Sequence, residues 1–287
     1  MAERKYWVEA TRPRTLVAGI VPVLVGTAAA GTLLPLRFIG ALVVAVFMQV
    51  GVNFANDYFD AVKGVDTHER LGPRRLTSSG LIPADAMRNA MVAAFAVALA
   101  AGLGMAAAAG WELAVVGAVS LLAALGYSGG PYPYGARGLG EVFVFIFFGV
   151  VATVGSAYVQ IEEISRIALC ASVPVGFLAS AILVANNLRD IPTDSRTSKR
   201  TLAVILGDAR NRVVFKALIL GSYLSLGLIA SCGGGPWALL PLLSIPLAIP
   251  VLRKVGTDSG RELIGVLAGT AKLQLAFGVL LALGLRW

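Results

Sequence analysis

The sequence predicts an all-α membrane protein in which about nine helices cross the bilayer. The 287 residues are 57% apolar, with a mean hydropathy of +0.80. Only 14% of them are charged, against roughly 25% in ordinary soluble domains. Apolar runs of about 20 residues, long enough to span the hydrocarbon core, recur along the whole chain. Alternation with a period of two is absent, which disfavours a β-barrel.

The apolar runs follow one another with few long interruptions. The expected spans are 15–34, 38–57, 86–109, 112–128, 140–160, 165–188, 212–232, 235–252 and 262–285. Gly and Pro occur inside several of them, which membrane helices tolerate because neighbouring groups satisfy the freed backbone. The basic segment before the first span has no small-residue cleavage pattern and reads as an anchor. Residues 1–287 are therefore expected to form a single transmembrane domain.

The basic residues are distributed very unevenly between the two sides of these spans. One side holds the N-terminus and the loops after the second, fourth, sixth and eighth spans. It carries 19 of the 24 Lys and Arg residues: Arg4, Lys5, Arg12, Arg14, Lys63, Arg70, Arg74, Arg75, Arg88, Arg137, Arg189, Arg196, Lys199, Arg200, Arg210, Arg212, Arg253, Lys254 and Arg261. The positive-inside rule makes this side cytoplasmic and places the C-terminus outside the cell membrane. The net charge of +8 therefore reflects topology and not a nucleic-acid partner.

Two polar motifs end the second and sixth spans, four spans apart and so on the same side. Motif one, 53–66, contains "NFANDYFD", and motif two, 186–194, contains "NNLRD". Both combine amides and carboxylates and are followed by Arg and Lys. The repetition indicates two parallel four-helix repeats plus a ninth helix around a central cavity, with the site between the repeats.

Helical spacing places the polar side chains of motif one on one face, because positions i, i+3, i+4 and i+7 align. These residues are Asn53, Asn56, Asp57 and Asp60, and Asp66 follows a turn at Gly64. In motif two, Asn186 and Asp190 lie one turn apart. Pro192 is expected to end that helix and to leave Asp194 in a loop.

The oxygen ligands of the two motifs suit Mg²⁺. His68 is the single histidine, and Cys170 and Cys232 lack metal-type spacing, so zinc, copper and iron sites are disfavoured. The two cysteines are expected to be small buried hydrophobes and not a disulfide. The basic residues that follow each motif suggest that an anion binds there. A diphosphate bridged to the carboxylates by a metal ion would neutralise both the acidic and the basic side chains. Carboxylates at membrane depth are functional by default.

The motifs resemble those of the UbiA-type intramembrane aromatic prenyltransferases, in particular those acting on 1,4-dihydroxy-2-naphthoate. The resemblance rests on "RPRTL", "NDYFDAVKGVD", "YSGGPYPYGARGLGEVFVFIFFG" and "SKRTLAV", in which Ser198 replaces the usual Gly. It implies Mg²⁺-dependent transfer of a polyprenyl group from its diphosphate to dihydroxynaphthoate, with loss of CO₂, in menaquinone synthesis. The product would be demethylmenaquinone.

The resemblance also implies roles for individual residues. Asp57, Asp60, Asp190 and Asp194 are expected to be catalytic. Metal ligation falls on Asn56, Asp57, Asp60, Asp66, Asn186, Asp190 and Asp194, with Asn53 and Asn187 as possible additions. Diphosphate binding falls on Lys63, Arg70, Arg74, Lys199 and Arg200. Contact with the acceptor or with an allylic cation is assigned to Asn53, Tyr58, Tyr127, Tyr132, Tyr134, Arg137 and Lys272, and Lys272 is alternatively expected to pair with Glu141.

Two other functions stay open at this stage. An enzyme of the same family would use another aromatic acceptor, such as 4-hydroxybenzoate or homogentisate. A cation-coupled transporter would also contain repeats and intramembrane carboxylates, although its acids should lie near the bilayer midplane.

Overall fold

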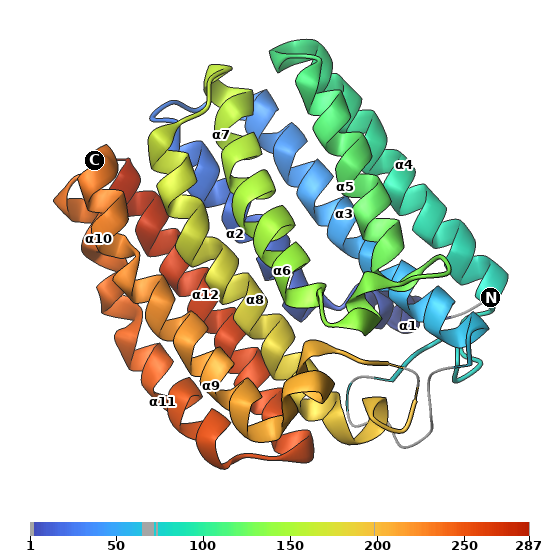
Figure 1. Ribbon diagram of the computed structural model, residues 1–287. Helices are drawn as coiled ribbons and strands as arrows, with labels where there is room; N and C mark the ends of the chain where they lie inside the picture. The colour runs from blue at the N-terminus through green and yellow to red at the C-terminus, as the bar shows by residue number, and fades with distance from the viewer. Residues whose placement is uncertain (1–2, 65–71, 73, 198, 287) are drawn as a thin grey trace.

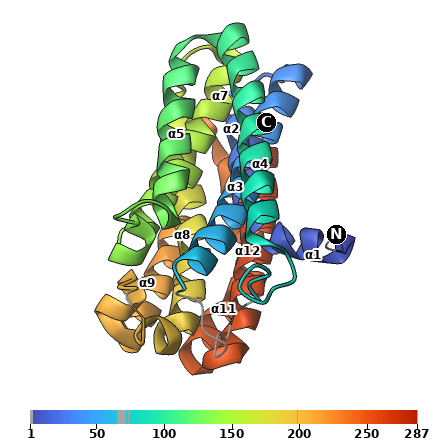
Figure 2. The ribbon, with the colours of Figure 1, turned by 90° about the vertical axis from the view of Figure 1, so that its right-hand side faces the viewer.

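Long helices run side by side through most of the structure (Figure 1). The computed structural model describes residues 3–64, 72, 74–197 and 199–286, and no strand occurs among these residues. The short helix α1 (Arg4–Ala10) projects from one end of the bundle (Figure 2). The all-α prediction is confirmed.

The helices have the following bounds. The first half contains α2 (Pro13–Ala29), α3 (Pro35–Val62), α4 (Ala84–Ala109), α5 (Glu112–Ser128) and the short turn η1 (Tyr134–Arg137). The middle contains α6 (Gly140–Val144), η2 (Phe145–Val151), α7 (Ala152–Ile161) and α8 (Arg166–Asp194). The last part contains α9 (Leu202–Leu224), α10 (Leu226–Ile229), η3 (Ala230–Gly234), η4 (Pro236–Ser244), α11 (Ile245–Thr257), η5 (Gly260–Glu262) and α12 (Leu263–Leu285).

Seven helical stretches of the described chain are long and apolar enough to cross a membrane. They are Pro35–Val62, Ala84–Ala109, Gly140–Ile161, Arg166–Asp194, Leu202–Gly234, Pro236–Thr257 and Gly260–Leu285. The remaining two expected spans correspond to α2 and α5, apolar helices of 17 residues each. The chain is a multi-pass membrane protein, and a count of nine spans stays a prediction.

Each helix that carries a motif packs against the next long helix in the chain, α3 against α4 and α8 against α9. Helix α12 packs against α2, which brings the first and last long helices together. Helix α2 also packs closely against α7. At that contact a Cβ on Gly26 would lie 2.1 Å from the carbonyl oxygen of Thr153, so only glycine fits there.

Two apolar clusters hold the bundle together. The larger joins α8, α9, α11 and α12 and includes the fully buried Phe215 and Phe277. The other joins α3 and α4 and includes Leu76 and Ile82, both with 0% exposure, from the segment between these helices. Because these two side chains are buried, the polar segment after motif one is packed against the bundle. This packing holds Arg75 beside motif one.

Helix α8 continues through Pro192 to Asp194, so the prediction that Pro192 ends the helix is wrong. A proline deprives a helix of one backbone hydrogen bond. Here it lies in the last turn, and the helix resumes normal bonding when the Ser195 N–H donates to the Ile191 carbonyl at 3.0 Å. Asp194 is therefore presented from the end of α8 and not from a loop.

The cysteine prediction is also wrong, because Cys170 and Cys232 form a disulfide. Cys170 lies in the first turns of α8, and Cys232 lies in η3, which packs against α8. The two positions are 62 residues apart, and only the packing of helices brings them together. The start of α8 and the segment around α10, which carry them, lie at the end of the bundle away from the two motifs (Figure 1).

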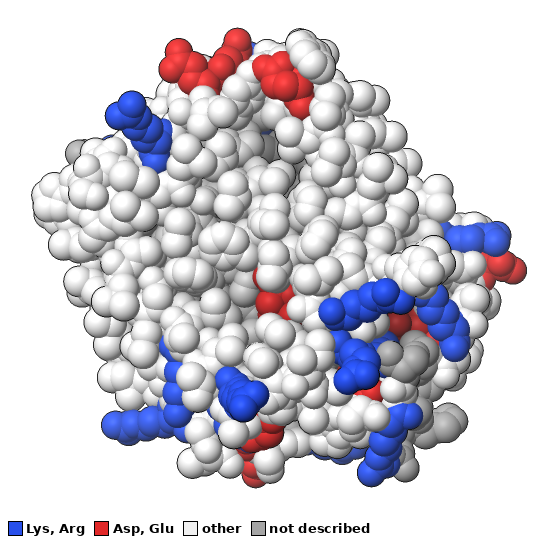
Figure 3. Space-filling model, in the orientation of Figure 1, with Lys and Arg blue, Asp and Glu red and all other residues white. Residues whose placement is uncertain are grey.

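Charged side chains gather at the ends of the bundle. On the face drawn in Figure 3, Lys and Arg concentrate at the lower end, where α8 leads into α9, and a wide, almost uncharged band lies above them. An uncharged band between charged ends is the surface expected of a protein that spans a bilayer.

Candidate active site

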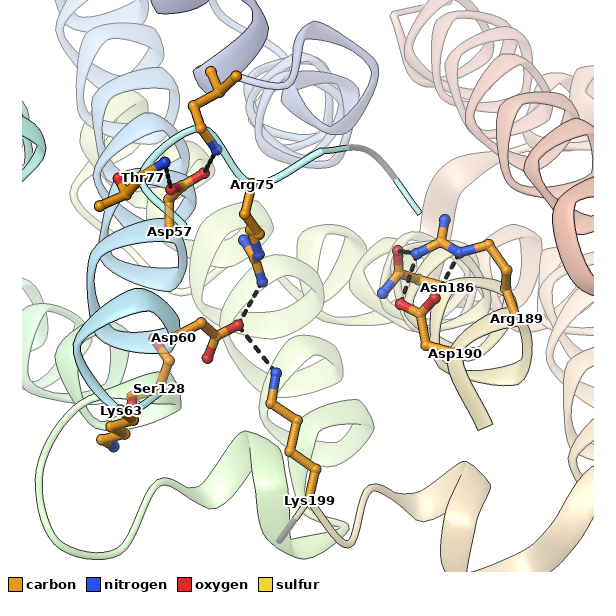
Figure 4. Close-up of polar contacts among 11 residues, drawn as sticks. Asp57, Asp60, Lys63, Arg75, Thr77, Ser128, Asn186, Arg189, Asp190 and Lys199 are labelled. Carbon is orange, nitrogen blue, oxygen red and sulfur yellow. Dashed lines mark hydrogen bonds and ion pairs between the residues drawn. The ribbon is translucent and has the colours of Figure 1, made fainter. Parts of the chain in front are cut away.

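Asp60, in the last turns of α3, links the two motifs. Its Oδ2 accepts hydrogen bonds from the Arg75 guanidinium at 2.7 Å and from Lys199 Nζ at 3.0 Å (Figure 4). Lys199 follows motif two and lies 139 residues further along the chain. All three side chains are largely buried. The prediction that the two motifs lie on the same face is confirmed by this contact.

Asp57, one turn before Asp60, has a different environment. Its Oδ1 accepts from the Thr77 backbone N–H at 2.8 Å, and its Oδ2 accepts from the Leu76 N–H at 3.1 Å (Figure 4). The side chain is 2% exposed and does not line the cavity described below. In this structure the Asp57 carboxylate therefore anchors the two consecutive backbone N–H groups that follow Arg75.

In motif two, Arg189 binds its neighbour Asp190 through both carboxylate oxygens. The distances are 2.8 Å from Nε to Oδ1 and 2.7 Å from Nη2 to Oδ2, and Nη2 also donates to Asn186 Oδ1 at 2.9 Å (Figure 4). Such a two-point contact fixes the planes of both groups. Gly72 packs against the same guanidinium, since a Cβ on it would lie 2.3 Å from Nη2. The segment after motif one therefore reaches motif two.

A cavity of about 450 Å³ opens between these motifs. Its polar end is lined by Asn56, Asp60, Arg75, Asp190, Asp194 and Lys199. The rest of its wall is mainly apolar and includes Leu99, Met105, Leu121, Phe147 and Leu267. Such a shape suits an amphiphile that has an anionic head and a long hydrocarbon tail.

The polar end offers oxygen donors that fit Mg²⁺. Asn56 Oδ1 is buried and makes no hydrogen bond with any described residue, and the carboxylates of Asp60, Asp190 and Asp194 line the same space. Within the described residues, no three His, Cys, Asp or Glu side chains lie close enough together to hold a metal by themselves. Amide, carboxylate and diphosphate oxygens together match the coordination that Mg²⁺ prefers.

The expected diphosphate-binding cations fall into three groups. Lys199 and Lys63 line the cavity, although Lys63 Nζ also donates to the Ser128 carbonyl at 2.7 Å. Arg74 lies over the Tyr6 ring, 5.9 Å from its centroid, and Arg200 is exposed, and neither lines the cavity. Arg70 and the expected metal ligand Asp66 lie outside the described residues.

Some of the residues expected to contact the aromatic acceptor line the cavity, and others lie outside it. Asn53, Tyr127 and Tyr134 line the cavity. The Tyr127 and Tyr134 rings meet edge to face at 5.5 Å, and Tyr134 stacks on Phe143 at 4.0 Å. Burial raises the pKa of the Tyr134 hydroxyl, which donates to the Ala123 carbonyl at 2.8 Å. These rings form an aromatic wall beside the polar end.

Four expected acceptor residues lie elsewhere. Tyr132 is 71% exposed and packs under Arg137, whose guanidinium carbon lies 4.4 Å from the ring centroid. Tyr58 contacts Phe59, and Lys272 lies on the exposed face of α12, and neither lines the cavity. The expected pairing of Lys272 with Glu141 is wrong, because Lys272 is exposed while Glu141 is buried, and no ion pair joins them within the described residues.

Sequence reasoning did not single out Arg75 as a site residue. It chose Arg74, the adjacent cation, because nothing in the order of residues shows which of the two side chains points inward. The signal is the backbone, since the contacts of Asp57 with the N–H groups of Leu76 and Thr77 fix the path of the chain there. That path directs Arg75 toward Asp60 and Arg74 toward Tyr6.

Known prenyltransferases resemble this chain in sequence over most of its length. The UbiA prenyltransferase family model matches residues 19–282. A 1,4-dihydroxy-2-naphthoate octaprenyltransferase of Mycobacterium tuberculosis is 41% identical over 287 residues, covering 98% of this chain and 97% of that protein. The enzyme of the same name from Escherichia coli is 37% identical, covering 87% of this chain and 84% of that protein.

A solved structure shares the fold. The UbiA homolog from Archaeoglobus fulgidus bound to GPP and Mg²⁺ superposes with a TM-score of 0.65 at 14% identity, covering 96% of this chain and 99% of that chain. The family match over most of the chain, the identity to naphthoate prenyltransferases and this shared helical fold lead to one conclusion: the chain belongs to the UbiA prenyltransferase family.

Proposed function

We propose that this protein transfers a polyprenyl group from polyprenyl diphosphate to 1,4-dihydroxy-2-naphthoate, with loss of CO₂ and diphosphate, giving demethylmenaquinol, the reduced form of demethylmenaquinone. The observation that carries the proposal is the polar end of the cavity, where Lys199, which follows motif two, meets Asp60 from motif one. The names of the relatives at 37% and 41% identity support dihydroxynaphthoate as the acceptor.

The diphosphate of the donor occupies the polar end in this proposal. Arg75, Lys199 and Lys63 supply positive charge there, and the first two exchange part of their contact with Asp60 for contact with phosphate oxygens. Asn56, Asp60, Asn186, Asp190 and Asp194 would hold Mg²⁺. When bound, Mg²⁺ stabilises the negative charge that develops on the leaving diphosphate.

The reaction needs one bond to break at the donor and one at the acceptor. The bond from C1 of the prenyl chain to the diphosphate oxygen breaks, and both electrons leave with the diphosphate. The carboxyl-bearing ring carbon attacks C1. The bond to the carboxylate then breaks and releases CO₂, and its electron pair restores the aromatic ring.

The walls of the cavity protect this chemistry. Tyr127, Tyr134 and Phe143 present aromatic rings beside the polar end, and a ring face stabilises a cation by about 0.5–2 kcal/mol. The apolar remainder holds the prenyl chain and excludes water from the cationic carbon. We propose that the motifs, and therefore the active site, lie on the cytoplasmic side of the cell membrane. The basic residues in the loops that follow the motifs support this orientation.

Competing acceptors test the proposal. Purified protein with Mg²⁺ and a labelled polyprenyl diphosphate is given equal concentrations of 1,4-dihydroxy-2-naphthoate, 4-hydroxybenzoate and homogentisate. The expected product is prenylated naphthoquinol. A preference for 4-hydroxybenzoate without release of CO₂ would contradict the naphthoate assignment. Cation transport into vesicles without prenyl transfer would favour a transporter, although the carboxylates here lie at helix ends and not at mid-span.

A further inference from the structure

Glu141 is a buried carboxylate that the proposed chemistry does not use. It is the second residue of α6, and its side chain is 6% exposed. Within the described chain no Lys or Arg forms an ion pair with it, and its Oε2 makes no hydrogen bond. A buried carboxylate without a compensating positive charge is costly, so its presence calls for an explanation.

Helix α8 holds Glu141 at two points. The hydroxyl of Ser180 donates to the main-chain carbonyl of Glu141 at 3.1 Å, and Nδ2 of Asn187 donates to Oε1 at 2.9 Å. Ser180 and Asn187 are two helical turns apart and so share a face of α8. The position of Glu141 relative to α8 is therefore fixed by both its backbone and its side chain.

This contact determines how the Asn187 amide is oriented. The Asn187 NH₂ group faces Glu141, because its Nδ2 donates to Oε1. The amide carbonyl oxygen therefore points away from that carboxylate oxygen. Asn187 lines the cavity, and its Oδ1 makes no hydrogen bond within the described residues. Glu141 thus fixes a hydrogen-bond acceptor on the cavity wall.

Aromatic side chains lie close to Gly140 and Glu141, the segment that Asn187 contacts. Tyr127 lies against the start of α6, because its hydroxyl is 3.8 Å from the position of a Cβ built on Gly140, the neighbour of Glu141. Tyr127, Tyr134 and Phe143 line the same cavity. A flat ring that carries a hydroxyl group matches an aromatic wall with one fixed hydrogen-bond acceptor.

The neighbouring amide, that of Asn186, lies on the side of the cavity that is proposed to hold the metal. Asn186 and Asp190 both bond to Arg189, in the cluster at the polar end. Asn187 is turned from Asn186 by about 100°, the rotation per residue of an α-helix, and it faces α6. Asn187 is therefore expected to contact the aromatic acceptor and not the metal.

We infer that Asn187, oriented by Glu141, accepts a hydrogen bond from a ring hydroxyl of the aromatic acceptor and thereby selects hydroxylated naphthoates. The inference rests on the proposed function and adds a specificity residue to it. Asn187 contacts the substrate, and Glu141 is a positioning residue that acts through Asn187.

Equilibrium binding without donor tests this, because it separates recognition of the hydroxyl from its effect on ring reactivity. Dissociation constants are measured for 1,4-dihydroxy-2-naphthoate and for the two analogues that each lack one hydroxyl. Wild-type protein should bind one of these analogues about tenfold more weakly. Asn187→Leu should remove that penalty, and Glu141→Gln should reduce it to about twofold to threefold, since a neutral amide no longer dictates the orientation of Asn187.

A matched control is Glu112→Gln, the same chemical change at a carboxylate that bonds to Tyr158 on α7 and does not line the cavity. It should leave every ratio unchanged, and KM for the prenyl diphosphate should change less than twofold in Glu141→Gln. An unchanged hydroxyl penalty in a folded Asn187→Leu or Glu141→Gln protein overturns the inference alone. A wild-type protein that neither binds nor prenylates dihydroxynaphthoate overturns the proposed function and the inference together.

Discussion

Substitution of Asp57 by Asn should loosen the segment that carries Arg75 while leaving the bundle folded. The Asp57 carboxylate accepts one backbone N–H on each oxygen, from Thr77 and Leu76. Asparagine has the same shape but only one oxygen. Its NH₂ group must therefore face one of these two N–H groups, which then has no acceptor.

The size of the effect follows from the contacts. A hydrogen bond to a charged group contributes about 1.5–3 kcal/mol, and a buried donor left without a partner costs about 1–3 kcal/mol. The retained bond also weakens because the charge is lost. The segment that carries Arg75 packs against the bundle, and it relaxes partly after the substitution. We expect this packing to weaken by about 2–3 kcal/mol, which is roughly a 30- to 150-fold rise in the population in which the segment is detached.

Hydrogen exchange measures this directly. In purified protein, the amides of Leu76 and Thr77 should exchange about 30- to 150-fold faster in Asp57→Asn than in wild type. Amides in the middle of α3 should keep their protection. Asp85→Asn is the control, because Asp85 is exposed and pairs with Arg88 on the surface. It should change exchange at Leu76 and Thr77 less than twofold.

The same substitution should lower prenyl transfer, because Arg75 is no longer held against Asp60. If Asp57 acts only as a metal ligand, Mg²⁺ affinity will fall while exchange at Leu76 and Thr77 stays at the wild-type rate. That combination would refute the anchoring role of Asp57.

Three further outcomes follow from the structure. Chelation with EDTA should abolish turnover, and Mg²⁺ should restore it. Asp190→Ala should lower turnover by several orders of magnitude in folded protein, and near-normal turnover of this variant would refute the metal role of Asp190. Gly26→Ala should destabilise the protein by at least about 1–3 kcal/mol through its clash with α7, as thermal unfolding would show, while Gly104→Ala, with open space around it, should not. Mass spectrometry of non-reduced peptides should find Cys170 linked to Cys232, and replacing both with Ser should cost about 2–5 kcal/mol, so unlinked peptides would contradict the pairing.

The sequence was informative where a single helix decides the outcome. Apolar length predicted the spans, and helical periodicity placed the motif-one side chains at the end of α3. The even number of spans between the motifs predicted that both lie on the same side. The contact of Lys199 with Asp60 confirms that consequence.

Details that depend on irregular backbone could not be predicted in the same way. Arg74 and Arg75 look equivalent in sequence. The backbone N–H groups of Leu76 and Thr77 donate to Asp57, and the chain path that this fixes directs Arg75, and not Arg74, into the cavity. Pro192 was judged by a rule for helix interiors, but it lies in the last turn, where little helix remains to be disrupted.

Contacts between distant helices were the other limit. The Cys170–Cys232 disulfide and the Glu141–Asn187 hydrogen bond each depend on how α8 packs against another helix. Lys272 was expected to reach the site because polar groups inside spans are often functional, yet it lies on the exposed face of α12. Residue spacing within one helix does not show which face of that helix meets the cavity.

The central claim is that this cavity joins a prenyl group to dihydroxynaphthoate with loss of the carboxyl group. The most direct measurement uses 1,4-dihydroxy-2-naphthoate labelled in its carboxyl carbon, together with polyprenyl diphosphate, Mg²⁺ and purified protein. We predict one labelled CO₂ and one diphosphate for each prenylated naphthoquinol formed. A prenylated product that retains the label, or diphosphate release without prenyl transfer, would contradict the claim.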